Sequence, residues 1–151
     1  MKISFPFNVT NIKTGEVLPQ TKAFDNKHAI GYEVELEHAR RLGVPRAKKG
    51  SDGFMPLLCA YPLGVKWAYT VFRELYIVPE FFKRDEIPHS IAAANHPVFC
   101  AGLAFYAENG NVVTVNNWTG HYQVPVVRAK SDILEAWADC GCAVHIGELI
   151  G

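Results

Sequence analysis

Two short segments carry most of the side chains that could transfer a proton or orient a polar substrate. IPHSIAA contains His89 and Ser90, and NNWTGHYQVP contains Asn117, His121 and Tyr122 just after an apolar run. Histidine titrates near neutral pH, and neighbouring hydroxyl or amide groups can orient the group that gains or loses the proton. The two segments together predict an acid–base site.

The four catalytic candidates are expected to meet across a sheet, because side chains of sequential neighbours usually diverge. His89 or Ser90 would then face His121 or Tyr122 around one hollow, with Asn117 binding the substrate. The alternative is structural: a histidine beside a tyrosine can be a hydrogen-bonded turn residue, and an asparagine can close an Asx turn.

Lys66 and Trp67 are further candidates for substrate binding, since an ammonium and a large ring stand side by side. A lysine flanking a strand can equally lie on the surface. Cys100 lies within the apolar run VFCAG, where a buried thiol is expected. A cysteine hydrolase that uses Cys100 or Cys59 with His121 is the minority alternative.

The sequence predicts no metal site and identifies no cofactor. Its four cysteines form no C-x-x-C pair, and the remaining histidines, His28, His38, His96 and His145, have no metal-ligand spacing. Cys140 and Cys142 are two apart, so on an extended chain they would point to opposite faces as free thiols. No nucleotide-binding loop or zinc-protease motif is present.

Length and charge predict one domain covering residues 1–151. Lys plus Arg and Asp plus Glu both number 15, so no net field favours nucleic acid as a partner, and a protein or small-molecule substrate is expected instead. No apolar run approaches the roughly 18 residues of a membrane span. The expected location is the cytoplasm, with export by a route independent of a signal peptide as the alternative.

The first half of the chain predicts a hairpin, a helix and a loop. Residues 2–9 and 16–18 flank a turn sequence. A helix over 26–42, capped by Asp25, is indicated by apolar residues near helical spacing. The glycine-containing, charged segment 46–53 predicts an exposed loop.

The second half predicts mostly strands. Residues 65–72 and 74–79 nearly meet at Arg73, and 97–107 and 112–116 are joined by ENGN, whose Asn-Gly pair is a strong hairpin signal. Ser131 is expected to cap a short helix, and 143–150 to form the last strand. We therefore expect an α+β domain: a bent, mainly antiparallel sheet of about five to seven strands with two helices.

The ordered motifs GVKW, LYIVP, HSIAA, AGLAF and GHYQVP, followed by a helix and GCAV, resemble a domain of plant IQ-motif calmodulin-binding proteins and of uncharacterised bacterial and fungal proteins. The resemblance covers about Gly64 to Val144. The matched positions are Lys66, Trp67, Tyr76, His89, Ser90, Ala101, Gly102, Gly120, His121 and Tyr122.

The chain departs from that family at several positions. Ile91 replaces a second serine, Leu103 a Glu or Arg, and Thr119 a serine, while Pro125 comes one residue late. The uncharged Leu103 argues against acid–base chemistry at that position. No basic amphipathic IQ helix is present, so calmodulin binding is not predicted. The resemblance implies a type of domain and no particular reaction.

The leading functional hypothesis is a small effector or toxin-like enzyme with a His/Ser/Tyr site at strand ends. Transfer chemistry on a protein or nucleotide substrate fits this hypothesis as well as hydrolysis does. The alternative from another class is a non-catalytic protein-binding or ligand-binding module. In it the histidines are structural, and Phe81, Phe82 and Trp118 contact a partner.

Overall fold

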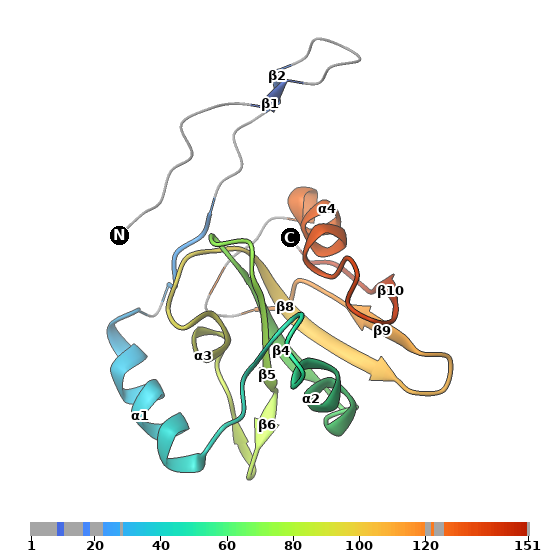
Figure 1. Ribbon diagram of the computed structural model, residues 1–151. Coiled ribbons are helices and arrows are strands. Elements are labelled where there is room, and N and C mark those ends of the chain that lie inside the picture. Colours follow the sequence, from blue (N-terminus) through green and yellow to red (C-terminus); the bar gives the residue numbers. More distant parts are fainter. Residues whose placement is uncertain are drawn as a thin grey trace.

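A mixed six-stranded sheet, in the order β10-β9-β8-β4-β5-β3, forms the centre of the protein (Figure 1). The computed structural model describes residues 9–10, 17–18, 23–27, 29–119, 122 and 126–150. The strands of this sheet are β3 (Ala47–Lys48), β4 (Val65–Thr70), β5 (Leu75–Pro79), β8 (Val98–Ala107), β9 (Val112–Val115) and β10 (Ala143–Ile146). The predicted α+β fold is confirmed.

Two antiparallel hairpins in the sheet match the sequence signals closely. β4 pairs with β5 across a turn in which Arg73 has φ 57°, and β8 pairs with β9 across a turn in which Gly110 has φ 102°. β4 also pairs with β8, so the two hairpins join into one surface. Aromatic and β-branched residues favour such strands, and glycine accepts a positive φ without strain.

The last strand is the exception to the antiparallel pattern. β10 pairs in parallel with β9, and the chain between them contains helix α4 (Val126–Ala136). Parallel neighbours need a crossover connection of this kind. This arrangement places residues 147–150 alongside the segment that follows β9, where Trp118 Nε1 donates to Glu148 O and Asn117 Nδ2 donates to Ile150 O.

In the part of the chain that the structure describes, four α-helices accompany the sheet, where the sequence predicted two: α1 (Tyr32–Leu42), α2 (Phe54–Ala60), α3 (His89–Ala93) and α4. α2 and α3 are too short to show helical periodicity. In Figure 1, α4 lies beside β9 and β10, and α1 and α3 lie together at the other end of the sheet.

The predicted helix caps were wrong. α1 begins at Tyr32, after a 3-10 turn at Ala29–Gly31, and its N-cap is Gly31 instead of Asp25. Ser131 lies inside α4, and its hydroxyl donates to Arg128 O at 3.2 Å. A serine that bonds back to the preceding turn is compatible with a helix interior, so its cap propensity was misleading.

The charged segment 46–53 contributes to the sheet instead of forming only a loop. Its β3 pairs with β5. Lys49 Nζ donates to Ala136 O at 2.8 Å and to Ala138 O at 2.7 Å, and so binds the carbonyl end of α4. A cation at a helix C-terminus is favourable there.

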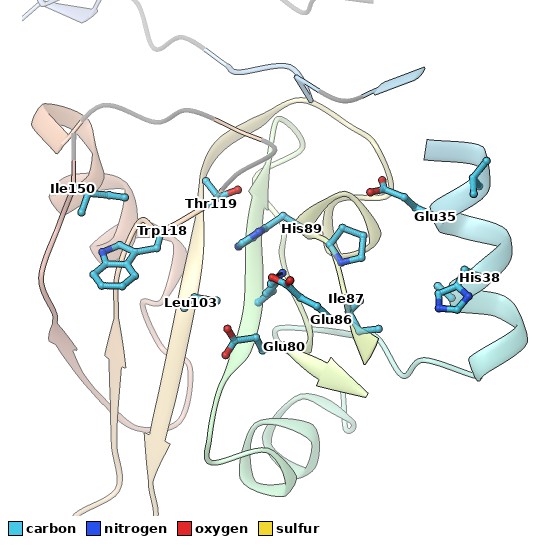
Figure 2. Close-up of a pocket in the computed structure, with 14 residues that line it drawn as sticks. Glu35, His38, Glu80, Glu86, Ile87, His89, Leu103, Trp118, Thr119 and Ile150 are labelled. Atoms are coloured by element: carbon cyan, nitrogen blue, oxygen red, sulfur yellow. Dashed lines mark hydrogen bonds and ion pairs between the residues drawn. The ribbon is translucent and has the colours of Figure 1, made fainter. Parts of the chain in front are cut away.

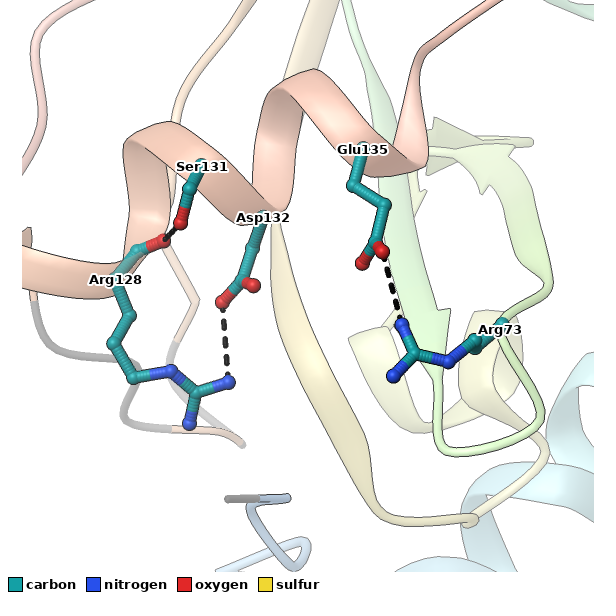
Figure 3. A network of polar contacts seen from close by, with 5 residues as sticks. All are labelled: Arg73, Arg128, Ser131, Asp132 and Glu135. Atoms are coloured by element: carbon teal, nitrogen blue, oxygen red, sulfur yellow. Dashed lines mark hydrogen bonds and ion pairs between the residues drawn. The ribbon is translucent and has the colours of Figure 1, made fainter. Parts of the chain in front are cut away.

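A second set of polar contacts fixes α4 against the β4–β5 turn (Figure 3). Arg73 Nη1 lies 2.9 Å from Glu135 Oε1, and Arg128 Nη2 lies 3.3 Å from Asp132 Oδ2 one helical turn away. Beneath them Trp137 packs against Trp67, with ring centroids 6.0 Å apart. The Arg73–Glu135 pair and the packing of Trp137 hold α4 against the β4–β5 hairpin, whereas the Arg128–Asp132 pair lies within the helix.

Two small sheets complete the described structure. β1 (Val9–Thr10) pairs antiparallel with β2 (Val17–Leu18), in agreement with the predicted first hairpin. β6 (Phe81–Phe82) pairs with β7 (Asp85–Glu86). Within the described residues, no helix is both long and apolar enough to span a membrane.

Candidate functional site

A pocket of about 750 Å³ lies between α1, the β4–β8 face of the sheet and the segments that follow β9 and β10 (Figure 2). The side chains of α1 line one wall, and Trp118 and Ile150 lie across from them. The polar residues that line it are Glu35, His38, Lys66, Glu80, Glu86, His89, Trp118 and Thr119.

Lys66 supplies the buried cation of this pocket. It lies in β4, its side chain is only 7% exposed, and its Nζ donates to Glu86 Oε1 at 2.9 Å. Glu86 is 64% exposed, so the pair lies where buried and solvated regions meet. An ammonium removed from water needs a charged partner, and Glu86 provides one.

The small β6–β7 hairpin brings the two carboxylates to the pocket. Glu80 precedes β6, and the chain reverses at Lys83 and Arg84, which both have positive φ, so that Glu86 returns beside Phe81. Ile87 N donates to Glu80 O at 2.8 Å and closes the base of the hairpin. The turn therefore places both carboxylates near Lys66.

Glu80 is the carboxyl group whose environment favours proton exchange. Burial raises its pKa above the ordinary value, the Lys66 ammonium lowers it, and the neighbouring Glu86 raises it. Burial has the largest effect, so the net direction is upward. A raised carboxyl pKa lies closer to neutral pH, where a general acid or base works best.

His89 forms part of the pocket wall. It is the first residue of α3, after the extended Pro88, and is 3% exposed. Its Nε2 lies 2.7 Å from Gly102 O. Because a carbonyl oxygen only accepts, Nε2 must carry the proton, which fixes the orientation of the ring.

Trp118 is held at the pocket by contacts at both ends. Asn116 Oδ1 accepts from Trp118 N at 3.0 Å and from Leu103 N at 2.9 Å, and Trp118 Nε1 donates to Glu148 O at 3.0 Å. The main chain of Asn116 passes so close to Gly102 that a Cβ there would overlap its carbonyl oxygen. Glycine at 102 is therefore required for this loop to approach β8.

The predicted residues are only partly brought together. Lys66 and His89 line the pocket. Ser90 is fully buried, and its hydroxyl donates to Glu35 Oε1 at 2.7 Å, which ties α3 to α1. Trp67 is fully buried, and its Nε1 donates to Leu103 O at 3.1 Å.

Tyr122 and Asn117 make structural contacts. The Tyr122 hydroxyl is buried, donates to His96 O at 3.1 Å, and has a pKa raised by burial. The Asn117 side chain exchanges hydrogen bonds with the main chain of Ile150, one of them 2.8 Å long. His121 lies outside the described residues, so the predicted pairing of His89 with His121 stays a prediction.

Cys100 is poorly suited to nucleophilic attack. It is fully buried in β8, and burial raises its thiol pKa to about 12. A cysteine nucleophile needs the opposite, a lowered pKa and access to substrate. Cys59 is exposed but does not line the pocket.

Sequence reasoning missed Glu80 and Glu86, which lie in the charged segment PEFFKRDEIP between the predicted strands. The available signal was the pair of acidic residues flanking a basic turn. It also missed Glu35, His38 and Thr119, while Trp118 was predicted only as an exposed contact for a partner. Among the described residues, no three His, Cys, Asp or Glu side chains gather closely enough to hold a metal ion.

Comparisons with models of protein families, with curated proteins and with solved structures found no match to this chain. The resemblance to the domain of plant IQ-motif proteins therefore stays a prediction. The chemical groups of the site are a carboxyl group with a raised pKa, a buried ammonium and a fixed indole.

Proposed function

We propose that the protein is an enzyme that performs acid–base chemistry on a polar substrate in this pocket. Glu80 is the general acid–base, and the Lys66 ammonium stabilises an oxygen that gains negative charge. Trp118 provides a flat surface for substrate binding. The observation that carries the proposal is the approach of Glu80 and Glu86 to the buried Lys66 within one pocket.

The size of the pocket supports a small-molecule substrate or a single side chain of a protein. Ligand pockets typically enclose about 300 to 1,000 Å³ and combine apolar walls with a few convergent polar groups. This pocket has a volume of about 750 Å³, and its apolar lining residues include Val34, Ile87 and Leu103. It is large enough for a nucleoside-sized molecule.

The charges support transfer or hydrolysis through proton movement. A substrate hydroxyl, amine or water would give its proton to the Glu80 carboxylate as it attacks, and Glu80 would return that proton to the leaving group. An ammonium has three N–H donors, and Glu86 is the hydrogen-bond acceptor recorded for Lys66 in the described part of the chain. The remaining donors suit a developing oxyanion.

The test uses purified protein and a mixture of cellular small molecules and peptides, with consumption followed by mass spectrometry. Wild type is compared with Glu80→Gln and with Glu108→Gln, a matched change at an exposed site in the β8–β9 turn. Consumption should be lost in Glu80→Gln and kept in Glu108→Gln, with equal melting temperatures. If a folded Glu80→Gln variant turns over substrate at the wild-type rate, the proposal fails.

A recognition module is the second candidate, favoured by apolar exposure near a smaller hollow of about 260 Å³. Leu63 is 90% exposed and Phe81 56% exposed, and both line this hollow. A module would bind a partner without consuming it, and Phe81→Ala would weaken that binding. Because Glu80 lines both hollows, consumption of substrate is the readout that distinguishes the two functions. The same samples therefore separate the two functions.

A further inference from the structure

The thiols of Cys140 and Cys142 lie together, contrary to the expectation from an extended chain. Their Sγ atoms are 3.5 Å apart. Gly141 between them has φ 100°, a conformation that breaks the alternation of side chains. The expectation that the two cysteines point to opposite faces was therefore wrong.

Neighbouring groups hold this Cys-Gly-Cys turn in place. Asn111 Nδ2 donates to Gly141 O at 3.3 Å, and Ala143 N donates to Asn111 O at 3.0 Å. Tyr106 in turn donates from its hydroxyl to Asn111 Oδ1 at 2.6 Å. Asn111 thus holds both Gly141 and Ala143, and this keeps the two sulfur atoms close together.

We propose that Cys140 and Cys142 are a dithiol site that low-molecular-weight disulfides, such as oxidised glutathione, convert into an intramolecular disulfide. The sulfurs need to move from 3.5 Å to about 2.05 Å, the length of an S–S bond. This site is separate from the pocket, and its chemistry does not depend on the proposed function.

The reaction balances in two exchange steps. The Cys142 thiolate attacks one sulfur of oxidised glutathione, forms a mixed disulfide and releases one glutathione thiolate. The Cys140 thiolate then attacks Cys142 Sγ, forms the protein disulfide and releases the second glutathione. The two cysteines lose two protons and two electrons, and one glutathione disulfide becomes two thiols.

Exposure sets the order of the steps. Cys142 is partly exposed, whereas Cys140 is buried, so Cys142 meets the reagent first. Burial and the hydrogen bond that the Cys142 thiol shares with Cys140 raise the pKa of Cys142, so its thiolate is scarce at neutral pH and the first step should quicken as pH rises.

The test treats Cys59→Ser with oxidised glutathione, since Cys59 is the other exposed thiol. The expected product has lost two hydrogens by intact mass, retains no glutathione, and shows the Cys140–Cys142 link in peptide mapping. Cys140→Ser in the same background should stop at the mixed disulfide on Cys142. A stable adduct on Cys142 while Cys140 is still present would overturn the proposal.

A second variant tests the role of the turn. Gly141→Ala places a Cβ at a φ that L residues rarely adopt, so the two sulfurs should no longer be held together. Ring closure after formation of the mixed disulfide should slow at least tenfold. If a folded Gly141→Ala variant closes the ring at the wild-type rate, Gly141 does not preorganise the two thiols. In the wild type, a disulfide between Cys59 and Cys142 would overturn the assigned pairing.

Discussion

Gly64 leaves the space that the carboxylate of Glu80 occupies: a Cβ on Gly64 would lie 2.5 Å from Glu80 Oε2. Gly64 also has φ 143°, and Glu80 N donates to Gly64 O at 3.2 Å. The glycine before the first strand of the β4–β5 hairpin thus leaves room for the carboxylate of the candidate acid–base group at its observed position.

Gly64→Ala should therefore lower stability and displace Glu80 together. Backbone strain alone costs on the order of 1 to 3 kcal/mol, and the contact with Glu80 adds to it. Gly110→Ala is the matched control, because Gly110 also has a positive φ but open space around its Cα. Chemical denaturation should show a larger loss for Gly64→Ala. Equal losses would mean that Glu80 moves aside at no cost.

The Lys66–Glu86 pair should respond unequally to removal of either partner. Glu86→Gln removes the carboxylate that pairs with the buried ammonium, leaves Glu80 as the nearby negative charge, and should cost on the order of 1 to 3 kcal/mol. Lys66→Met removes the ammonium and keeps an apolar side chain of similar length. Glu86 then loses its partner but is 64% exposed to water, so the loss of stability should be smaller. Denaturation midpoints of the two variants check this order, and the reverse order would contradict burial of Lys66.

Lys66→Met should also change proton binding by Glu80. The Lys66 ammonium lowers the pKa of Glu80 against the larger effect of burial, so its removal should move that pKa further upward. Carboxyl NMR of Glu80 during a pH titration measures this directly. A pKa of Glu80 that stays the same or falls would show that the two groups are not coupled.

The strands were predictable because their signals are local. The Asn109-Gly110 turn and the aromatic and β-branched runs determine the two hairpins without reference to distant residues. α3 was not predictable in this way, because HSIAA makes a single turn of helix. Its placement depends on contacts such as Ser90 with Glu35, 55 residues apart.

The candidate site was predictable in part for the same reason. Lys66 and His89 were selected from their residue types and motif positions, and both line the pocket. Tyr122 was selected on the same grounds, but its hydroxyl is buried and donates to His96 O, a contact between residues far apart in the sequence. Glu80 required knowing that Lys83 and Arg84 reverse the chain, and the acidic residues that flank this basic turn were the local sign of it.

Tyr122→Phe separates a structural role of the phenol from the predicted catalytic one. The hydroxyl donates to His96 O in a buried setting, so its removal should cost about 1 kcal/mol and lower the melting temperature. Turnover of any substrate found should stay within twofold of wild type, because the phenol is committed to that carbonyl. Loss of turnover at unchanged stability would support catalysis by Tyr122 instead.

Asp132 should make stability depend on pH between about 4 and 6. Burial raises its pKa from the ordinary 3.8 to about 6, against the opposing effect of Arg128 (Figure 3). The folded protein thus binds this proton more tightly than the unfolded chain does. The stabilisation is complete below about pH 4 and is lost as pH rises through 6.

Asp132→Asn removes this titration, so the free energies of unfolding of the variant and the wild type should diverge as pH rises from 4 to 7. At about 1.4 kcal/mol for each pKa unit, the divergence should be on the order of 3 kcal/mol in favour of Asn. Asp139→Asn, at an exposed site after the same helix, is the control for the loss of a carboxyl group. A constant difference between Asp132→Asn and wild type across this range would mean that Asp132 titrates alike in the folded and unfolded chains.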